Sequence, residues 1–304
     1  MLDIFLNVIL PVFVVAAIGA AFQRWRMIPI APLSQVALYL LAPCLIFTYL
    51  VQQEMPATVS FKVVGAILLT QIFVITTGLL VSRVLRHDRP MQSAFLLSTG
   101  FPNSGNMALP VLLLAFGDPG LTVGIIVFVT EAIVGQSFGI FVAARSQMSG
   151  LGAMKQIFKL PAIYAIAAAL AVRLLGVELP PTIFEPAKML SQAAIPLMLV
   201  VLGLQLGSGF SLDRPGSLLA ALVVRLLVAA PLAYVATLLI GLNGLPQAVV
   251  VIVASMPVAV FTTILAMEFK ANAKFVTAVV ISSSFASLVT LTVVVSVVKS
   301  WLEL

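Results

Sequence analysis

The chain has 304 residues, of which 62% are hydrophobic and only 9% are charged, and its formal net charge is +6. A soluble domain carries about 25% charged residues, so this composition argues against an ordinary soluble protein. The basic residues lie in short connectors between apolar blocks, where they indicate membrane topology and lipid-headgroup contacts and argue against nucleic-acid binding.

Taken in chain order, the apolar blocks predict an all-α polytopic membrane protein, because each is long enough to cross a bilayer core of about 30 Å. The ten expected spans are residues 3–22, 31–51, 61–82, 91–115, 121–144, 160–177, 186–206, 216–240, 246–268 and 274–298. The first block lacks a preceding basic segment and is long enough to span, so it is expected to be a retained helix rather than a cleaved signal.

The Lys and Arg residues of alternate connectors predict the orientation. One side holds eleven of them: Arg24, Arg26, Arg83, Arg86, Arg89, Arg145, Lys155, Lys159, Arg214, Lys270 and Lys274. The other side holds Lys62, Lys188 and Lys299, with Arg173 near a helix end. Because the side richer in Lys and Arg normally faces the cytoplasm, both termini are expected on the non-cytoplasmic side of the cell inner (plasma) membrane.

The two halves of the chain share short sequence features in the same order. The matching pairs are Leu10-Pro11 with Leu160-Pro161, Leu33-Ser34-Gln35 with Leu190-Ser191-Gln192, and Gln92 and Pro102 with Gln247 and Pro257. Five spans in each half make the second half enter the membrane from the opposite face, which predicts inverted repeats. The expected repeats are residues 1–144 and 160–304, joined by a cytoplasmic linker at 145–159. Chance similarity between apolar helices is the alternative interpretation.

Two spans carry helix-breaking residues at similar depth, about 17 Å into the membrane. Span four contains prolines, glycines and asparagines between Ser98 and Pro110, and span nine contains Pro257. Each unsatisfied backbone group costs several kcal/mol in hydrocarbon, so these segments must lie within protein or line a polar cavity. Half-helices that meet there offer N-terminal ends to an anion and carbonyls to a cation. Simple packing kinks are the alternative. The expected substrate-binding residues are Pro102, Asn103, Asn106, Pro257, Val258 and Thr262.

Ionisable residues inside spans are the second kind of candidate, because an isolated charge in the bilayer is costly. Glu131 lies near the middle of span five and is a candidate for proton coupling, supported by Gln136; a static pair or a permanently protonated acid is equally compatible. Arg225 could bind substrate, pair with Glu131 or extend to the cytoplasmic face, and a structural or coupling role is favoured. Gln71 occupies the matching position in the first repeat.

The segments FPNSGNMALPVLLLAFG (101–117) and ASMPVAVFTTILAMEF (254–269) resemble the crossover helices of the auxin efflux carrier family, and the resemblance covers the whole chain. Pro102 and Asn103 match that family's asparagine–proline element, and Pro257 matches its second crossover proline. The resemblance implies a fold like that of bile-acid sodium symporters.

The same resemblance implies a scaffold domain of spans 1, 2, 6 and 7 and a transport domain of spans 3–5 and 8–10 that moves as an elevator. It also implies a carboxylate bound at the crossover and a homodimer. The central loop is shorter than in plant members, and Val258 and Phe261 stand where more polar residues are expected, so indole acetate is not implied as the substrate.

These features predict a secondary transporter of a small organic anion, with no cofactor and no metal site, and with coupling to protons, to sodium or to neither. The alternative is a sodium-coupled symporter of larger amphipathic acids such as bile-acid-like anions. An intramembrane enzyme is disfavoured because the spans carry no catalytic motif, and a non-transporting subunit would have no need of matched broken helices. The chain also lacks a Gly-x-x-x-x-Gly-Lys nucleotide-binding loop.

Overall fold

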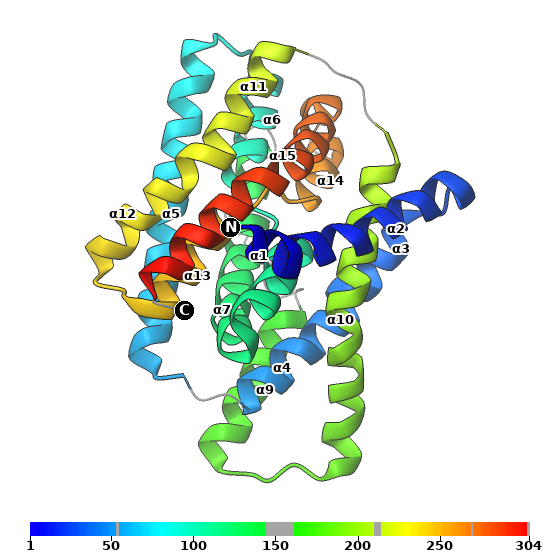
Figure 1. Ribbon diagram of the computed structural model, residues 1–304, viewed down its shortest axis with the longest axis vertical. Helices are drawn as coiled ribbons and strands as arrows, with labels where there is room; N and C mark the ends of the chain where they lie inside the picture. The colour runs from blue at the N-terminus through cyan, green and yellow to red at the C-terminus, as the bar shows by residue number, and fades with distance from the viewer. Residues whose placement is uncertain (53–54, 144–160, 210–213, 269, 303–304) are drawn as a thin grey trace.

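Helices form almost all of the computed structural model shown in Figure 1. The structure describes residues 1–52, 55–143, 161–209, 214–268 and 270–302, with the backbone only for 135–143 and 268, and this part of the chain contains no β-strand. The linker expected at 145–159 lies outside the described residues. The chain is therefore an all-helical membrane protein, as its composition predicts.

The helices follow one another along the chain, interrupted by π-helical turns that are labelled η. The first half contains α1 (Leu2–Ile4), η1 (Phe5–Ile9), α2 (Leu10–Arg26), α3 (Ile30–Gln35), η2 (Val36–Leu41), α4 (Ala42–Gln52), α5 (Ala57–Val84), α6 (Arg89–Gly100), η3 (Ser104–Ala108) and α7 (Leu109–Ala143). The second half contains α9 (Pro161–Leu175), α10 (Pro181–Gly207), α11 (Pro215–Val223), η4 (Val224–Val228), α12 (Ala229–Ile240), α13 (Gly244–Ala254), α14 (Phe261–Glu268) and α15 (Ala273–Trp301).

Seven helical runs among the described residues are long and apolar enough to cross a membrane, and α9 and α13 are shorter apolar helices. A Cβ atom at Gly124 would lie 2.5 Å from the Leu112 side chain, so α7 consists of two helices that lie against each other. The break expected between spans four and five lies between them at Gly117, whose φ of 64° and ψ of −156° are not helical. Glycine tolerates this left-handed φ because it lacks a Cβ atom. The chain thus crosses the membrane several times, and the count of ten crossings in two inverted repeats stays a prediction.

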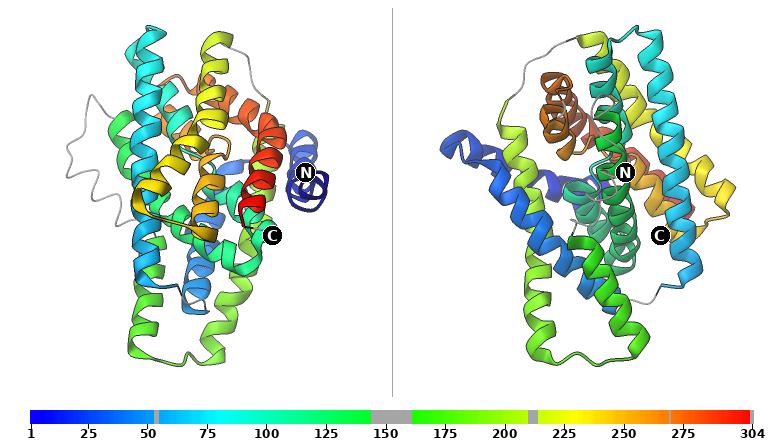
Figure 2. Two further views of the ribbon diagram at one scale, coloured as in Figure 1. Left: turned by 60° about the vertical axis from the view of Figure 1, so that its left-hand side comes forward. Right: turned by 180° about the vertical axis from the view of Figure 1, so that it is seen from behind.

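The helices pack in two groups. The first helix group consists of α2, α3, η2, α4, α9 and α10, in which α10 packs along α2 and α4, and α4 packs against α9. α9 and α10 are joined by a connector at one end of the molecule, and α4 packs between them (Figure 1 and Figure 2). The second helix group consists of α5, α6, η3, α7 and α11 to α15, in which α5 contacts α6, α7 and α12 and α13 contacts α7. The groups meet mainly where η3 and α7 lie against α10 and α4.

Glycines bring α2 and α10 into close backbone contact within the first helix group. A Cβ atom at Gly19 would lie 2.7 Å from the Val200 carbonyl oxygen, and one at Gly207 would lie 2.6 Å from the Ala20 carbonyl oxygen. A Cβ atom at Gly203 would overlap the backbone of α2 at Ala16. Because apolar lipid gives helices little hydrophobic reason to associate, this close packing is what joins α2 to α10.

The substitution G203A is expected to destabilise the protein by about 1–3 kcal/mol, because the added methyl group forces α2 and α10 apart. The readout is the apparent melting temperature of the purified protein in detergent. G216A is the matched control, since a Cβ atom at Gly216 meets nothing within 4 Å. Equal melting temperatures for G203A and the wild type would show that the helix contact tolerates a side chain.

A histidine joins the two halves of the second helix group at its polar end. His87, in the α5–α6 connector, lies 3.0 Å from the Ser82 hydroxyl through Nδ1 and 2.9 Å from the Ser217 hydroxyl through Nε2. Burial and the positive charge of Arg214 lower the pKa of His87, against an opposing effect of Asp88. The neutral imidazole therefore links the end of α5 to the start of α11.

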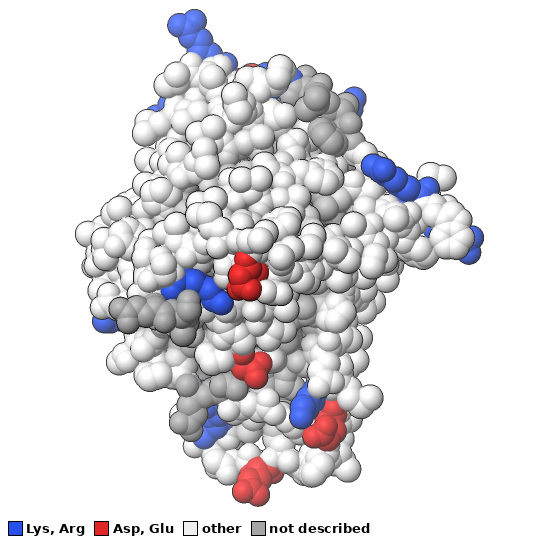
Figure 3. All heavy atoms as spheres, viewed as in Figure 1, with Lys and Arg blue, Asp and Glu red and all other residues white. Residues whose placement is uncertain are grey.

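Most of the face shown in Figure 3 is uncharged. Lys and Arg mark the top and the upper right, and side chains of both charges lie near the middle and in the lower half. Large apolar side chains are exposed on the helix surfaces, for example Leu174 at 86% and Val84 at 80%. Such a surface suits a multi-pass membrane protein, and the orientation of the termini stays a prediction.

Candidate functional site

Two helices are interrupted in the middle of the second helix group. After α6 ends at Gly100, the chain is not helical until Ser104, and after α13 ends at Ala254 it is not helical until Phe261. The prolines explain both breaks, because proline cannot donate a backbone hydrogen bond and restricts the residue before it to extended conformations. Phe101, which precedes Pro102, has φ −117° and ψ 107° as expected.

The two interruptions are hydrogen-bonded to each other. The Asn103 backbone N–H donates to the Pro257 carbonyl at 2.7 Å, and the Ala259 N–H donates to the Phe101 carbonyl at 2.9 Å. The two segments run antiparallel at this point. We call the segments Phe101–Asn103 and Pro257–Ala259 together the paired break. The pairing satisfies part of the backbone that helix breaking frees, so fewer main-chain groups are left for a ligand than the sequence suggests.

Arg225 connects the ends of the two broken helices. Its side chain is 1% exposed, and Nη1 donates to the Thr99 carbonyl at 2.9 Å while Nη2 donates to the Ala254 carbonyl. Thr99 and Ala254 lie in the last turns of α6 and α13, where carbonyls lack partners within the helix and carry partial negative charge. Arg225 therefore does not extend to a membrane face, and both of its Nη atoms bind main chain at the paired break.

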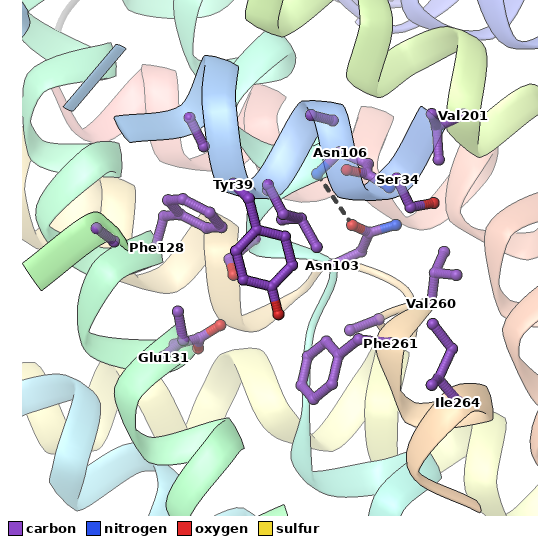
Figure 4. A pocket seen from close by; sticks show the side chains of 18 of the residues that line it. Ser34, Tyr39, Asn103, Asn106, Phe128, Glu131, Val201, Val260, Phe261 and Ile264 are labelled. Carbon is purple, nitrogen blue, oxygen red and sulfur yellow. Dashed lines mark hydrogen bonds between the residues drawn. The ribbon is translucent and has the colours of Figure 1, made fainter. Parts of the chain in front are cut away.

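A cavity of about 120 Å³ lies beside the paired break and between the two helix groups. Its polar lining residues are Ser34, Tyr39, Asn103, Ser104, Asn106, Glu131 and Gln205. Apolar walls come from Leu38, Phe128, Val201, Val260, Phe261 and Ile264, among others. In Figure 4, Tyr39 and Ser34 approach from the helix above, Glu131 from the side, and Asn103 from the paired break. The described residues that line the cavity include no Lys, Arg or His.

Two buried polar groups of the lining have unused hydrogen-bonding capacity within the described part of the chain. Glu131 is 6% exposed and its Oε2 atom has no hydrogen-bond partner; the Ser104 hydroxyl is its polar neighbour. Asn103 is 4% exposed, and its Nδ2 atom also has no partner. Because the Asn103 Oδ1 atom accepts from the Asn106 N–H at 3.1 Å, the amide is held with Nδ2 free to donate. A buried polar atom without a hydrogen-bond partner destabilises the folded protein unless a ligand or a water molecule forms that hydrogen bond.

The structure divides the expected substrate-binding residues into two sets. Pro102, Asn103 and Asn106 line the cavity, whereas the other three are buried at the break and do not line it. Pro257 and Val258 hold the backbone pairing, and the Val258 N–H donates to the Ser283 hydroxyl at 3.1 Å. The Thr262 hydroxyl donates to the Ala259 carbonyl at 2.6 Å. The second break and the start of α14 therefore contribute Ala259, Val260, Phe261 and Ile264 to the cavity instead.

Of the polar residues expected inside the membrane, one lines the cavity and two others lie outside its lining. Glu131 lines the cavity, and Arg225 lies behind the paired break. Gln71 is 5% exposed on α5, away from the cavity lining, and its Nε2 atom has no hydrogen-bond partner among the described residues. The backbone of Gln136 belongs to α7, and its side chain lies outside the described residues.

Several lining residues were not among the expected site residues. They are Ser34 from α3, Tyr39 from η2, Gln205 from α10, Phe128 from α7 and Phe261 from α14. Each stands in an apolar block where its type is unremarkable. One signal existed: Ser34 belongs to the Leu-Ser-Gln element that the two halves share.

Comparison with known proteins gives consistent results. The family model described as "Membrane transport protein" matches residues 4–295. An uncharacterized transporter from Methanothermobacter thermautotrophicus is 26% identical over 262 residues, which cover 85% of this chain and 86% of the relative. An uncharacterized transporter from Methanocaldococcus jannaschii is 24% identical over 265 residues, which cover 84% of this chain and 86% of the relative.

Proposed function

Because this chain belongs to the membrane transport protein family, we propose that it is a secondary transporter that carries a small organic anion through the cavity beside the paired break. Family membership makes it a transporter rather than an enzyme, and it confirms the resemblance to auxin efflux carrier-type permeases. The substrate we propose is a carboxylate.

The observation that carries the proposal is the free Asn103 amide at the start of a helix. Asn103 precedes η3, which continues into the part of α7 before Gly117, so the N-terminal end of this helical segment meets the cavity at Asn103. Helix N-termini carry partial positive charge and favour anions. The Nδ2 atom of Asn103 adds a donor that no described protein group uses. A carboxylate placed here would receive both interactions.

The size of the cavity favours a small acid over the larger amphipathic acids of the alternative hypothesis. Pockets for drug-sized ligands measure roughly 300–1,000 Å³, whereas this cavity measures about 120 Å³. A bile-acid-like anion would need the two helix groups to separate. Sodium dependence of uptake into proteoliposomes distinguishes the two hypotheses, because the symporter of larger acids requires sodium.

The location of the cavity supports an elevator mechanism in our proposal. One wall comes from α3, η2 and α10 of the first helix group, and the opposite wall comes from the paired break, α7 and α14 of the second. We propose that the first helix group is the scaffold domain and that the second is the transport domain, which slides against it and carries the bound anion. Arg225 would keep the two broken helices together during this movement, because it binds the ends of both.

The substitution N103A is expected to weaken carboxylate binding about tenfold or more, since hydrogen bonds to a charged group contribute about 1.5–3 kcal/mol. Binding of a panel of small carboxylates to purified protein is measured by calorimetry. N243A is the matched control, because Asn243 is exposed and its side chain makes no capping hydrogen bond. Unchanged affinity of N103A for every ligand that the wild type binds would remove Asn103 from the site.

A further inference from the structure

The charges around the cavity are unbalanced for a site that binds anions. Glu131 and Tyr39 are the titratable residues of the described lining, and Glu131 is the more acidic of the two. The cation that acts electrostatically on Glu131 is Arg225. Both Nη atoms of Arg225 bind carbonyls at the ends of α6 and α13, and Arg225 is not among the residues that line the cavity, so its guanidinium is not placed to grip a ligand.

The other elements around the cavity add no further charge among the described lining residues. Those residues are Ser34 of α3, Ser104 and Asn106 of η3, Gln205 of α10, Pro161 and Ala162 of α9, and Phe261 and Ile264 of α14. With Glu131 ionised, its charge and that of Arg225 sum to zero. One added carboxylate then makes two negative charges against one positive charge, and a dicarboxylate makes three.

Two carboxylates in one buried site do not both stay ionised, because like charges at short distance in a low dielectric repel strongly. They share a proton instead, so that one acid group donates an O–H hydrogen bond to the other. The Oε2 atom of Glu131 has no described hydrogen-bond partner and is available for this bond. A second carboxylate on the ligand would find no free cation and no second acid in the described lining.

We infer that the cavity takes a monocarboxylic acid together with one proton, which Glu131 shares with the ligand carboxylate, and that it rejects dicarboxylates. This inference rests on the proposed function. An ionised ligand and one proton from water enter together, and the proton bridges an oxygen of Glu131 and an oxygen of the ligand. Both leave on the other side of the membrane, so no covalent bond to carbon changes and no net charge crosses.

The rest of the cavity suits such a ligand. The free Nδ2 atom of Asn103 can donate to the second carboxylate oxygen, and in Figure 4 Asn103, Tyr39 and Glu131 surround the same space. Phe128 and Phe261 provide apolar walls for a hydrocarbon or aromatic body. Tyr39 is 52% exposed and lies in the lining of the cavity.

The test measures the affinity of purified wild-type protein, E131Q and E185Q by calorimetry between about pH 5.5 and pH 8.5, a range that includes neutral pH. The probes are isobutyrate and benzoate as monocarboxylates and malonate and succinate as dicarboxylates, each in sodium and in potassium buffer. E185Q is the matched control, because Glu185 is exposed on α10 and undergoes the same chemical change. A melting curve of each variant verifies that it is folded.

In the wild type and E185Q, monocarboxylate affinity is expected to fall toward tenfold per pH unit at the alkaline end, because each bound ligand takes up one proton. E131Q is expected to lose this pH dependence, since its amide donates a hydrogen bond at every pH. Dicarboxylates are expected to bind at least tenfold more weakly than monocarboxylates. The pH dependence of monocarboxylate affinity and the weaker binding of dicarboxylates are both measured on the wild type, so they do not depend on any variant being stable.

Three results would overturn the inference while leaving the proposed function intact. They are dicarboxylates that bind as tightly as monocarboxylates, wild-type binding that does not change with pH, and a wild-type pH slope that persists in folded E131Q. A requirement for sodium would also overturn it, by assigning the charge balance to a metal cation. If no carboxylate binds under any condition, the proposed function itself fails, and the inference fails with it.

Discussion

Replacing Arg225 by Met is expected to destabilise the protein by about 3–5 kcal/mol and to abolish transport, the cost typical of removing one partner from a buried charged interaction. Met has similar length and packs well, so the effect reports the loss of the guanidinium rather than of volume. The carbonyls of Thr99 and Ala254 would lose their partner in a region where water is scarce. The stability and the transport activity of R225K are expected to lie between those of R225M and the wild type, because an ammonium lacks the planar fork that reaches two carbonyls.

Apparent melting temperature and proteoliposome uptake are measured together for these variants. R83M is the matched control, because Arg83 is exposed near the end of α5. A normal melting temperature for R225M with loss of uptake would assign Arg225 to coupling rather than to holding the paired break. A normal melting temperature together with normal uptake for R225M would show that the two broken helices do not depend on the hydrogen bonds of Arg225.

Filling the cavity with A132F is expected to reduce carboxylate affinity at least a hundredfold. Ala132 follows Glu131 on α7 and lines the cavity, whose volume of about 120 Å³ leaves little room for a ligand once a phenyl ring enters. The effect is steric, so it should be nearly the same for all ligands and at every pH. This distinguishes it from the effect of E131Q, which should change the pH dependence.

The comparison for A132F is A17F, because Ala17 is exposed on the surface of α2. Calorimetry and a melting curve are carried out on both proteins. If A132F binds ligand as the wild type does while remaining folded, the substrate lies elsewhere, and the cavity between the two helix groups is not the binding site.

Local sequence explains the positions of the two breaks. Proline removes a backbone donor and restricts its predecessor, effects that act within one turn of helix and can therefore be predicted without a fold. Pro102 and Pro257 were expected to interrupt their helices, and both helices are interrupted there. What the sequence does not contain is the partner of each freed group: the Asn103 N–H binds a carbonyl at Pro257, far away along the chain.

The lining residues from the first helix group were harder to predict than those from the paired break, η3 and α7. Asn103 and Asn106 are conspicuous because amides are rare between apolar blocks, and Glu131 is conspicuous because a carboxylate inside the bilayer is costly. Tyr39 and Gln205 have no such distinction, and they belong to the site only because η2 and α10 pack against η3 and α7. Val258 and Thr262, which are expected to bind substrate as neighbours of a breaking proline, are buried and do not line the cavity, and their role stays a prediction.

The sequence by itself determined that this is a helical membrane protein with two broken segments and a buried acid, because apolar length, proline and charge act through the nearest residues and the surrounding lipid. Only the tertiary structure decided that the breaks pair with each other and that Arg225 binds the Thr99 carbonyl, 126 positions away along the chain. It also decided which side chains surround Glu131. Those contacts depend on how whole helices pack, and helix packing is set by the fit of many side chains at once rather than by any single residue.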